Sequence, residues 1–186
     1  MINNEVFNEY KDYNKTLHER GNFHGGSLKF EYTKNIKSIV DATNSVTVLD
    51  YGCGKAMHYK KEKPINELFN IASKNMRFYD IGVPEYEVIP DGTFDGVICT
   101  DVLEHVPEDI IDDVIEQLFS KADKFVFLVI SCGLAVKILP NGENAHVTVK
   151  HPEWWNSKLK QYYRANRIVH IKYTIPTDPK YNILNL

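Results

Sequence analysis

An acidic residue and a pair of glycines directly follow the apolar segment of residues 45–49. Asp50 ends the segment, and Gly52 and Gly54 lie one residue apart just beyond it. Glycines in such a turn let the backbone bend sharply and approach a ligand closely, because no Cβ intervenes. A dinucleotide site would place a third glycine three residues later and open directly into a helix, so that amides meet a pyrophosphate. Met57 stands there instead, and the carboxylate before the turn favours a ligand with a positive or hydrogen-donating group.

A second group of side chains suited to chemistry comes later in the chain. Asp101, Glu104 and His105 form the pattern D-x-x-E-H after one apolar run, and His146 follows the next. Carboxylates and imidazoles together suit a divalent metal that would lower the pKa of a substrate hydroxyl. Without a metal, His105 or His146 would suit the role of general base, because imidazole titrates near neutral pH. Both interpretations make Glu104, His105 and His146 the candidate catalytic residues.

Strands and helices must alternate to bring these residues together. The apolar or alternating runs that predict strands are residues 45–50, 76–80, 86–89, 94–101, 124–130, 145–149 and 167–175. The helical spacing of apolar residues predicts helices over the first twenty residues, after a cap at Ser27, after Pro64, after Pro107 and around Trp154. The first predicted strand is apolar on both faces, which is typical of a buried parallel strand.

This alternation predicts a Rossmann-like α/β fold, with a mostly parallel sheet and helices on both faces. We expect a single domain over residues 1–186, in which 1–27 form an N-terminal helix and a lid-like turn and 28–186 form the core. Ligands of such sheets bind at the carboxyl ends of the strands, near the point where the strand order reverses. The acids and glycines therefore follow strands at the edge where a ligand is expected.

The segment VLDYGCGKA, with the later aspartate of MRFYD and the segment FDGVICTDVLEHV, resembles the class I S-adenosylmethionine-dependent methyltransferases. The resemblance covers most of the chain. It implies that the glycine turn holds the amino-acid part of S-adenosylmethionine, with Asp50 acting through hydrogen bonding or charge. Gly52, Cys53 and Gly54 would act through close approach of the backbone.

The same resemblance assigns the ends of two later strands. Asp80, thirty residues after Asp50, matches the acid that accepts from both ribose hydroxyls, and a carboxylate has two oxygens for that purpose. Asp101, Val102 and Leu103 would pass beside the cofactor, mainly through backbone contacts. The implied reaction is methyl transfer, in which the enzyme aligns the acceptor, the methyl group and the sulfur.

A pattern similar to D-x-x-E-H binds a divalent metal in two groups of these enzymes. They are the small-RNA 2′-O-methyltransferases and the ubiquinone-pathway O-methyltransferases, in which E-x-x-E-H is followed by a later histidine. The resemblance implies a divalent metal at Glu104, His105 and His146 as one interpretation, while LEHV also occurs in methyltransferases without a metal. The gathering of acids and histidines favours methyl transfer to an oxygen of a small molecule.

Two features depart from the family pattern. Many members have a third glycine where this chain has Ala56, and only fourteen residues separate Asp80 from Asp95, which is short for a helix and a strand. Two other functions stay open. One is a nicotinamide-dependent oxidoreductase, against which the missing third glycine and the acid before the turn both count. The other is a non-catalytic domain of methyltransferase type that binds the cofactor or a protein partner.

Composition limits the partners and the location. The chain has 186 residues, of which 43% are hydrophobic and 25% charged, and its formal net charge of -3 gives no broad positive surface for nucleic acid. Three separated cysteines without C-x-x-C fit a reducing compartment. The N-terminus lacks the pattern of a signal peptide, and no apolar run reaches membrane-spanning length. We expect a cytoplasmic protein with a small-molecule substrate, and neither nucleic acid nor a membrane as partner.

Overall fold

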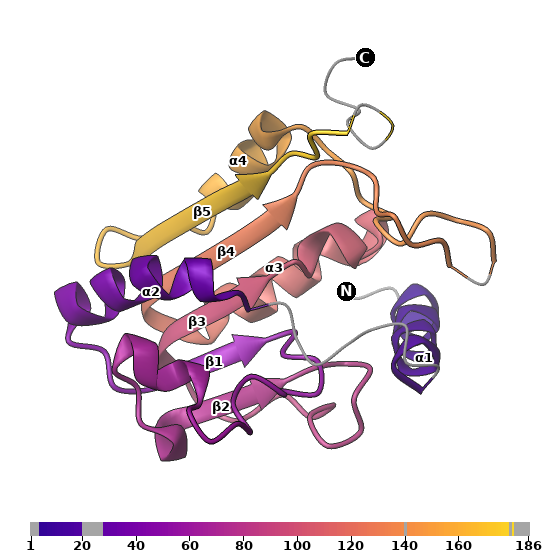
Figure 1. The fold of residues 1–186 in the computed structure, drawn as a ribbon. Helices are drawn as coiled ribbons and strands as arrows, with labels where there is room; N and C mark the ends of the chain where they lie inside the picture. The colour runs from indigo at the N-terminus through magenta and orange to yellow at the C-terminus, as the bar shows by residue number, and fades with distance from the viewer. Residues whose placement is uncertain (1–3, 20–27, 140, 179, 181–186) are drawn as a thin grey trace.

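Five parallel strands form one sheet at the centre of the computed structural model, in the order β2-β1-β3-β4-β5 (Figure 1). The strands are β1 (Val48–Tyr51), β2 (Met76–Tyr79), β3 (Phe94–Thr100), β4 (Ala122–Ser131) and β5 (Ile168–Thr174). The structure describes residues 4–19, 28–139, 141–178 and 180. Every pairing between these strands is parallel, so the predicted Rossmann-like α/β fold is confirmed.

The position of β1 within the sheet decides where a ligand can bind. β1 pairs with β2 on one side and with β3 on the other. The connection after β1 therefore leads to one edge of the sheet, and the connection after β2 leads back across β1 to the other half. This reversal of strand order opens a crevice at the carboxyl end of β1. The glycine turn follows β1 directly and therefore lies at the switch point.

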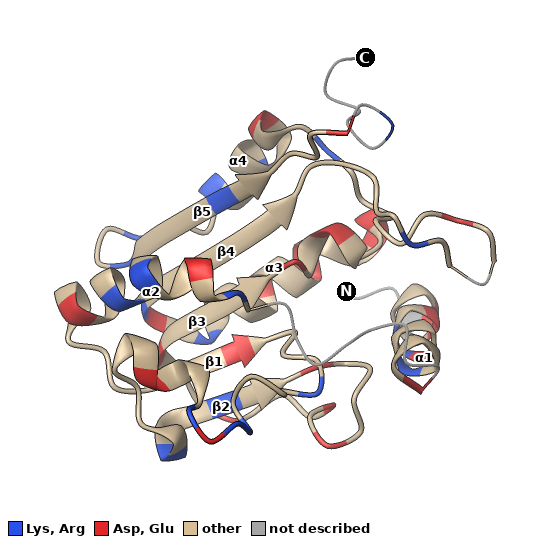
Figure 2. Ribbon diagram, viewed as in Figure 1, with Lys and Arg blue, Asp and Glu red and all other residues tan. Residues whose placement is uncertain are grey.

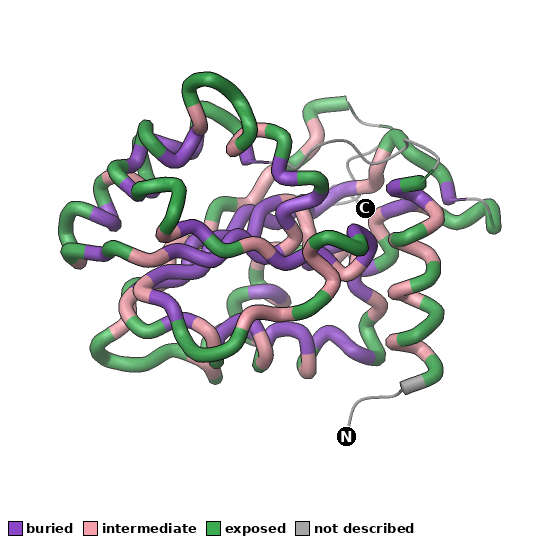
Figure 3. The backbone as a smooth tube through the Cα atoms, turned by 90° about the horizontal axis from the view of Figure 1, so that it is seen from below, coloured by how far each residue is buried: buried purple, intermediate pink, exposed green. Residues whose placement is uncertain are grey.

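Helices cover both faces of the sheet, as predicted. α2 (Phe30–Thr43) and the 3-10 helix η1 (Ile65–Phe69) pack on one face, and α3 (Ile111–Ser120) and α4 (Pro152–Lys160) pack on the other. Shorter 3-10 helices are η2 (Ser73–Asn75), η3 (Leu103–His105) and η4 (Glu108–Ile110). Because β4 lies between the two layers it is almost entirely buried, whereas β5 at the sheet edge is half-buried. Figure 3 shows that buried backbone gathers in the middle of the molecule.

The N-terminal helix α1 (Asn4–Glu19) lies across the carboxyl ends of the strands rather than on a face of the sheet (Figure 1). Its residue Leu17 packs with Leu139 and Ala145, so the helix is attached to the loop that follows β4. The predicted N-terminal helix is confirmed, while the predicted lid-like turn and Ser27 lie outside the described residues. No helix in the described part of the chain combines the length and the apolar character needed to cross a bilayer.

The strand predicted at residues 86–89 is wrong. The backbone there folds into turns: the carbonyl of Tyr86 accepts from the amide of Asp80, and the amide of Tyr86 donates to the carbonyl of Val83. The connection from β2 to β3 is too short for a crossover helix and a further strand, so it returns to β3 through these turns.

The strand predicted at residues 145–149 is also wrong. The amide of Thr148 donates to the carbonyl of Glu104 at 3.0 Å, and the amide of His146 donates to Oδ1 of Asn144 at 3.0 Å. These amides pair with a loop and a side chain, so they take no part in the sheet. The segment instead connects the end of β4 with η3, which carries Glu104.

Two predicted helices have different bounds. The helix after Pro64 is only the short η1, because Asn70 adopts a left-handed conformation that ends it. The helix after Pro107 starts as the 3-10 turn η4 and becomes α-helical at Ile111. α2 begins after Lys29, whose side chain forms no capping hydrogen bond.

Gly96 in β3 leaves room for an aromatic ring in the neighbouring strand. A Cβ at Gly96 would lie 2.0 Å from Cε1 and Cζ of Phe125, a residue of β4 that is fully buried. We expect Gly96→Ala to lower the free energy of unfolding by about 3 kcal/mol, because overpacking a rigid core forces side chains and backbone to shift. Urea denaturation measures this change. An unchanged midpoint would show that Phe125 can move away.

Candidate functional site

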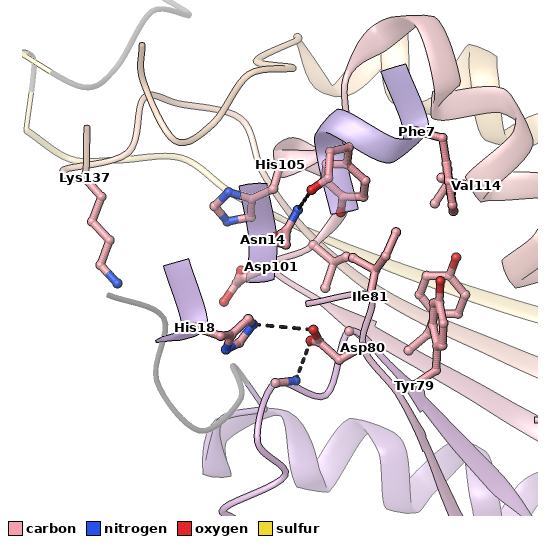
Figure 4. Close-up of a pocket in the computed structure, with 15 residues that line it drawn as sticks. Phe7, Asn14, His18, Tyr79, Asp80, Ile81, Asp101, His105, Val114 and Lys137 are labelled. Atoms are coloured by element: carbon pink, nitrogen blue, oxygen red, sulfur yellow. Dashed lines mark hydrogen bonds and ion pairs between the residues drawn. The ribbon is translucent and has the colours of Figure 1, made fainter. Parts of the chain in front are cut away.

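A cavity of about 230 Å³, here called the edge cavity, lies between the carboxyl edge of the sheet and α1 (Figure 4). The turns after β1, β2 and β3 contribute Gly52, Gly54, Asp80, Asp101 and Val102 to its wall. α1 contributes Phe7, Tyr10, Asn14 and His18. Residues far apart in the sequence therefore meet here because three parallel strands end at the same edge.

The glycine turn is fixed by backbone contacts to the end of β2. The amides of Gly52 and Cys53 both donate to the carbonyl of Tyr79, at 2.7 and 3.1 Å. Gly52 has a φ of +84°, and a Cβ there would lie 2.3 Å from Cγ2 of Val102. Glycine is required at this position by its conformation and by the close packing of the β3 turn.

Asp80 connects the turns after β1 and β2. Its Oδ2 accepts from the amide of Gly54 at 2.7 Å, and its Oδ1 accepts from the amide of Gly82 at 3.0 Å. Nε2 of His18, from α1, lies 3.4 Å from Oδ1 (Figure 4). A carboxylate has about four lone-pair positions, so Asp80 can accept further hydrogen bonds from a ligand in the cavity.

Asp50 lies behind the glycine turn and not in the wall of the edge cavity, as far as the described residues define that wall. It is buried, and Oη of Tyr59 donates to its Oδ2 at 2.8 Å. Burial raises the pKa of Asp50 to about 7, although the hydrogen bond from Tyr59 lowers it. The carboxyl group supports the segment after the turn, and it does so partly in the neutral form.

The raised pKa of Asp50 predicts how stability depends on pH. In the unfolded chain this carboxyl has a pKa near 4, so between about pH 4 and pH 7 the unfolded state loses a proton that the folded state keeps. The stability contributed by neutral Asp50 is therefore complete at low pH and falls as the pH rises toward 7. Relative to wild type, Asp50→Asn should gain roughly 2–3 kcal/mol on moving from about pH 5 to about pH 8.

Urea denaturation of both proteins at the two pH values measures this difference. Asp91→Asn is the matched control, because it makes the same substitution at an exposed position before β3. Parallel profiles for wild type and Asp50→Asn would contradict the assignment of a raised pKa to Asp50.

The residues after β3 take different roles. Asp101 has a φ of +52°, and its Oδ2 lies 3.6 Å from Nζ of Lys29. Burial raises the pKa of Asp101, and Lys29 opposes this rise. Val102 lies in the wall of the edge cavity, whereas Leu103 is buried in the core. Asp101, the first acid of D-x-x-E-H, therefore pairs with Lys29.

Glu104, His105 and His146 come together, as the sequence predicts. One ligand atom from each of them lies within 4.8 Å of the others. Nδ1 of His105 lies 2.7 Å from the carbonyl oxygen of Ala145, and Nδ1 of His146 lies 2.6 Å from that of Gly133. Each carbonyl accepts a hydrogen bond from Nδ1–H, so in the neutral ring Nε2 carries the lone pair. Carbonyl partners of this kind orient histidines that ligate metals.

Burial also sets the charge state of the cluster. Burial raises the pKa of Glu104 to about 8 and lowers the pKa of His105 to about 4, and the pKa of His146 is lowered for the same reason. Oε1 of Glu104 accepts from the amide of Ser131 at 3.0 Å. Oε2 is buried and forms no hydrogen bond with the part of the chain that the structure describes. A divalent cation would provide this oxygen with a partner and stabilise the carboxylate.

Asn144 positions the loop that carries His146. Its Oδ1 accepts from the amides of Ala135 and His146, at 2.9 and 3.0 Å, and its Nδ2 donates to the carbonyl of Ala135 at 2.9 Å. These bonds close the loop that leads from β4 to His146. Asn144 therefore holds His146 against Gly133 and close to Glu104.

Sequence reasoning missed several residues of the edge cavity. Tyr10, Asn14 and His18 come from α1, and Lys137 comes from the loop after β4 (Figure 4). Helical spacing indicated which residues of α1 share a face, but it could not indicate that this face covers the carboxyl edge. His18 and Asn14 are four residues apart on α1, so the sequence does place them on the same face of that helix.

Comparisons with known proteins gave no match: no protein-family model, no curated protein and no solved structure matches the chain. Function is therefore inferred from the residues and the geometry of the site.

Proposed function

We propose that the chain is an S-adenosylmethionine-dependent methyltransferase that methylates an oxygen of a small molecule. One observation carries the proposal: the glycine turn, Asp80 and His105 line a single cavity, although they follow three different strands. The glycine turn, the acid after β2 and one member of the candidate catalytic cluster thus line one space. That arrangement is the one that transfer from a bound methyl donor to a neighbouring acceptor requires.

The residues of the edge cavity fit the cofactor. After binding the amides of Gly54 and Gly82, Asp80 can accept from two ribose hydroxyls if one of them replaces the contact with His18. Gly52 brings the backbone to the cavity wall at the switch point, where a methionine tail can lie against it. Asp50 lies outside the cavity wall and supports the segment after the turn through its hydrogen bond with Tyr59. Bound S-adenosylmethionine would supply a methyl group that is already strongly electrophilic, so the chain needs only to orient the acceptor and accept its proton.

Glu104, His105 and His146 fit a divalent metal, as the unpartnered Oε2 of Glu104 and the orientation of both histidines support. The imidazole-rich set of ligands favours a transition metal such as Zn²⁺ over Mg²⁺. A metal in this position would bind the acceptor hydroxyl and lower its pKa. Without a metal, neutral His105 or His146 would accept the proton near pH 7, but the lowered pKa of both makes them weak bases.

Calorimetry with two cofactors tests the proposal. S-adenosylhomocysteine should bind the full chain with a Kd on the order of micromolar, which corresponds to about −8 kcal/mol, and NADH should not bind. Binding of NADH in place of S-adenosylhomocysteine would favour an oxidoreductase. Failure of both to bind would remove the basis of the proposal. A non-catalytic domain would bind S-adenosylhomocysteine, yet its biological activity would survive Glu104→Gln.

A further inference from the structure

A second cavity lies on the other side of α1 and adjoins the first. This cavity, here called the outer cavity, has a volume of about 550 Å³ and lies between α1 and residues 139 and 141–147 of the loop after β4. Such a volume suits a small organic molecule. Oη of Tyr13 accepts from the amide of Asn141 at 3.2 Å, which attaches the helix to the loop across the cavity.

The outer cavity meets the edge cavity at the candidate catalytic cluster. Tyr10, Asn14 and His105 line both cavities. His105 lies with Glu104, whose Oε2 is fully buried and accepts no hydrogen bond from the described residues. A ligand in the outer cavity would therefore meet a cofactor in the edge cavity beside His105, which brings the two close enough for transfer.

The charged groups of the outer cavity are all of one sign. Three carboxylates line it, from Glu9 and Asp12 of α1 and from Glu143 of the loop, and the ribbon of Figure 2 has red acidic positions on both elements. Among the described residues no lysine or arginine lines this cavity; Lys137 lines the edge cavity instead. The rings of Tyr10 and Tyr13 add aromatic surface. Carboxylates and aromatic faces together attract an organic cation and repel phosphates and carboxylates.

We propose that the outer cavity binds the methyl acceptor and that this acceptor is a small organic cation that carries a hydroxyl group. The inference rests on the proposed function, because it assigns the second substrate of the same reaction. The hydroxyl oxygen forms the new bond to the methyl carbon, the carbon–sulfur bond breaks, and S-adenosylhomocysteine leaves with the electron pair. The hydroxyl proton passes to a neutral histidine of the cluster or, when a metal holds both histidines, to water.

Three matched phenols test the charge of the acceptor: tyramine, 4-ethylphenol and 4-hydroxyphenylacetate, which are cationic, neutral and anionic. Calorimetry on the full chain, with and without S-adenosylhomocysteine, gives the three affinities. Tyramine should bind about tenfold more tightly than the other two, as carboxylates and aromatic rings favour a cation. Equal binding of the three, preference for the carboxylate, or no binding of any of them would overturn the proposal.

A double variant locates the effect. Glu9→Gln combined with Glu143→Gln should reduce the tyramine affinity about fivefold, because exposed charge pairs contribute modestly. Both residues are exposed, so the substitutions should leave the fold intact, and Glu5→Gln on the same helix is the matched control. An unchanged tyramine affinity in the double variant would place the cation elsewhere.

Failure of this inference can be told apart from failure of the proposed function. If S-adenosylhomocysteine binds and tyramine does not, the methyltransferase proposal stands and the acceptor class is wrong. If tyramine binds in the outer cavity and S-adenosylhomocysteine does not bind, the cation site stands and the methyltransferase proposal fails.

Discussion

Asp80→Ala is expected to weaken the binding of S-adenosylhomocysteine roughly 100-fold, since hydrogen bonds that involve a charged group each contribute about 1.5–3 kcal/mol. The substitution removes the acceptor for the ribose hydroxyls. It also leaves the amides of Gly54 and Gly82 without the oxygens that now fix the two turns. Calorimetric titration of the wild type and the variant with S-adenosylhomocysteine measures the change.

Asp91→Ala is the matched control for Asp80→Ala, because Asp91 lies exposed in the turn that precedes β3. Its affinity should equal that of the wild type. Circular dichroism and urea denaturation establish that Asp80→Ala still folds. If a folded Asp80→Ala variant bound S-adenosylhomocysteine within about threefold of wild type, a loss of under 1 kcal/mol, then the ribose would not lie at Asp80.

Glu104→Gln should abolish metal binding while it leaves the cofactor site intact. Glutamine keeps Oε1 as the acceptor for the amide of Ser131, but its amide nitrogen cannot ligate a cation as Oε2 would. We expect the affinity for Zn²⁺ to fall about 100-fold or more, because a ligand and a charge are lost together. The affinity for S-adenosylhomocysteine should change by less than about threefold, since Glu104 is absent from the wall of the edge cavity.

Asp109→Asn is the matched control for this variant, because Asp109 is an exposed acid five residues further along the chain. Calorimetry with Zn²⁺ alone and then with S-adenosylhomocysteine alone gives both affinities for each protein. If Glu104→Gln bound Zn²⁺ as tightly as the wild type, the cation would bind elsewhere. If the wild type failed to bind Zn²⁺, the cluster would act through its histidines without a metal.

The sequence predicts the part of the site that follows the strands. Asp80, Gly52 and Asp101 each come directly after an apolar run, and parallel strands bring their carboxyl ends to one edge. Glu104, His105 and His146 were predicted as one group because two strand ends carry them, and their ligand atoms do lie together. Local pattern and the rule for parallel sheets were sufficient for these residues.

The sequence could not predict the contacts made by side chains from other elements. His18 reaches Asp80 because α1 crosses the carboxyl edge, which depends on how Leu17 packs with Leu139 and Ala145 rather than on any local pattern. The pairing of Lys29 with Asp101 likewise joins two segments that are far apart in the chain. Such contacts are decided by tertiary packing.

The predicted strand at residues 86–89 shows a limit of a different kind. Its short apolar and alternating pattern resembles that of a strand, but Val88 is exposed and the connection is too short to add a neighbour to the sheet. The short connection between β2 and β3 indicates the absence of this strand better than the apolar pattern does, since each further parallel strand needs a crossover of a dozen or more residues. Asn144 was missed because its role depends on two backbone positions that only the folded loop brings together.

A crystal structure of the chain with S-adenosylhomocysteine and Zn²⁺ tests the central claim most directly. We expect the ribose to lie against Asp80, the methionine tail to lie along Gly52 and Gly54, and the sulfur to face a cation held by Glu104, His105 and His146. A ligand bound away from Asp80, or a cation whose ligands include none of these three residues, would contradict the proposed site.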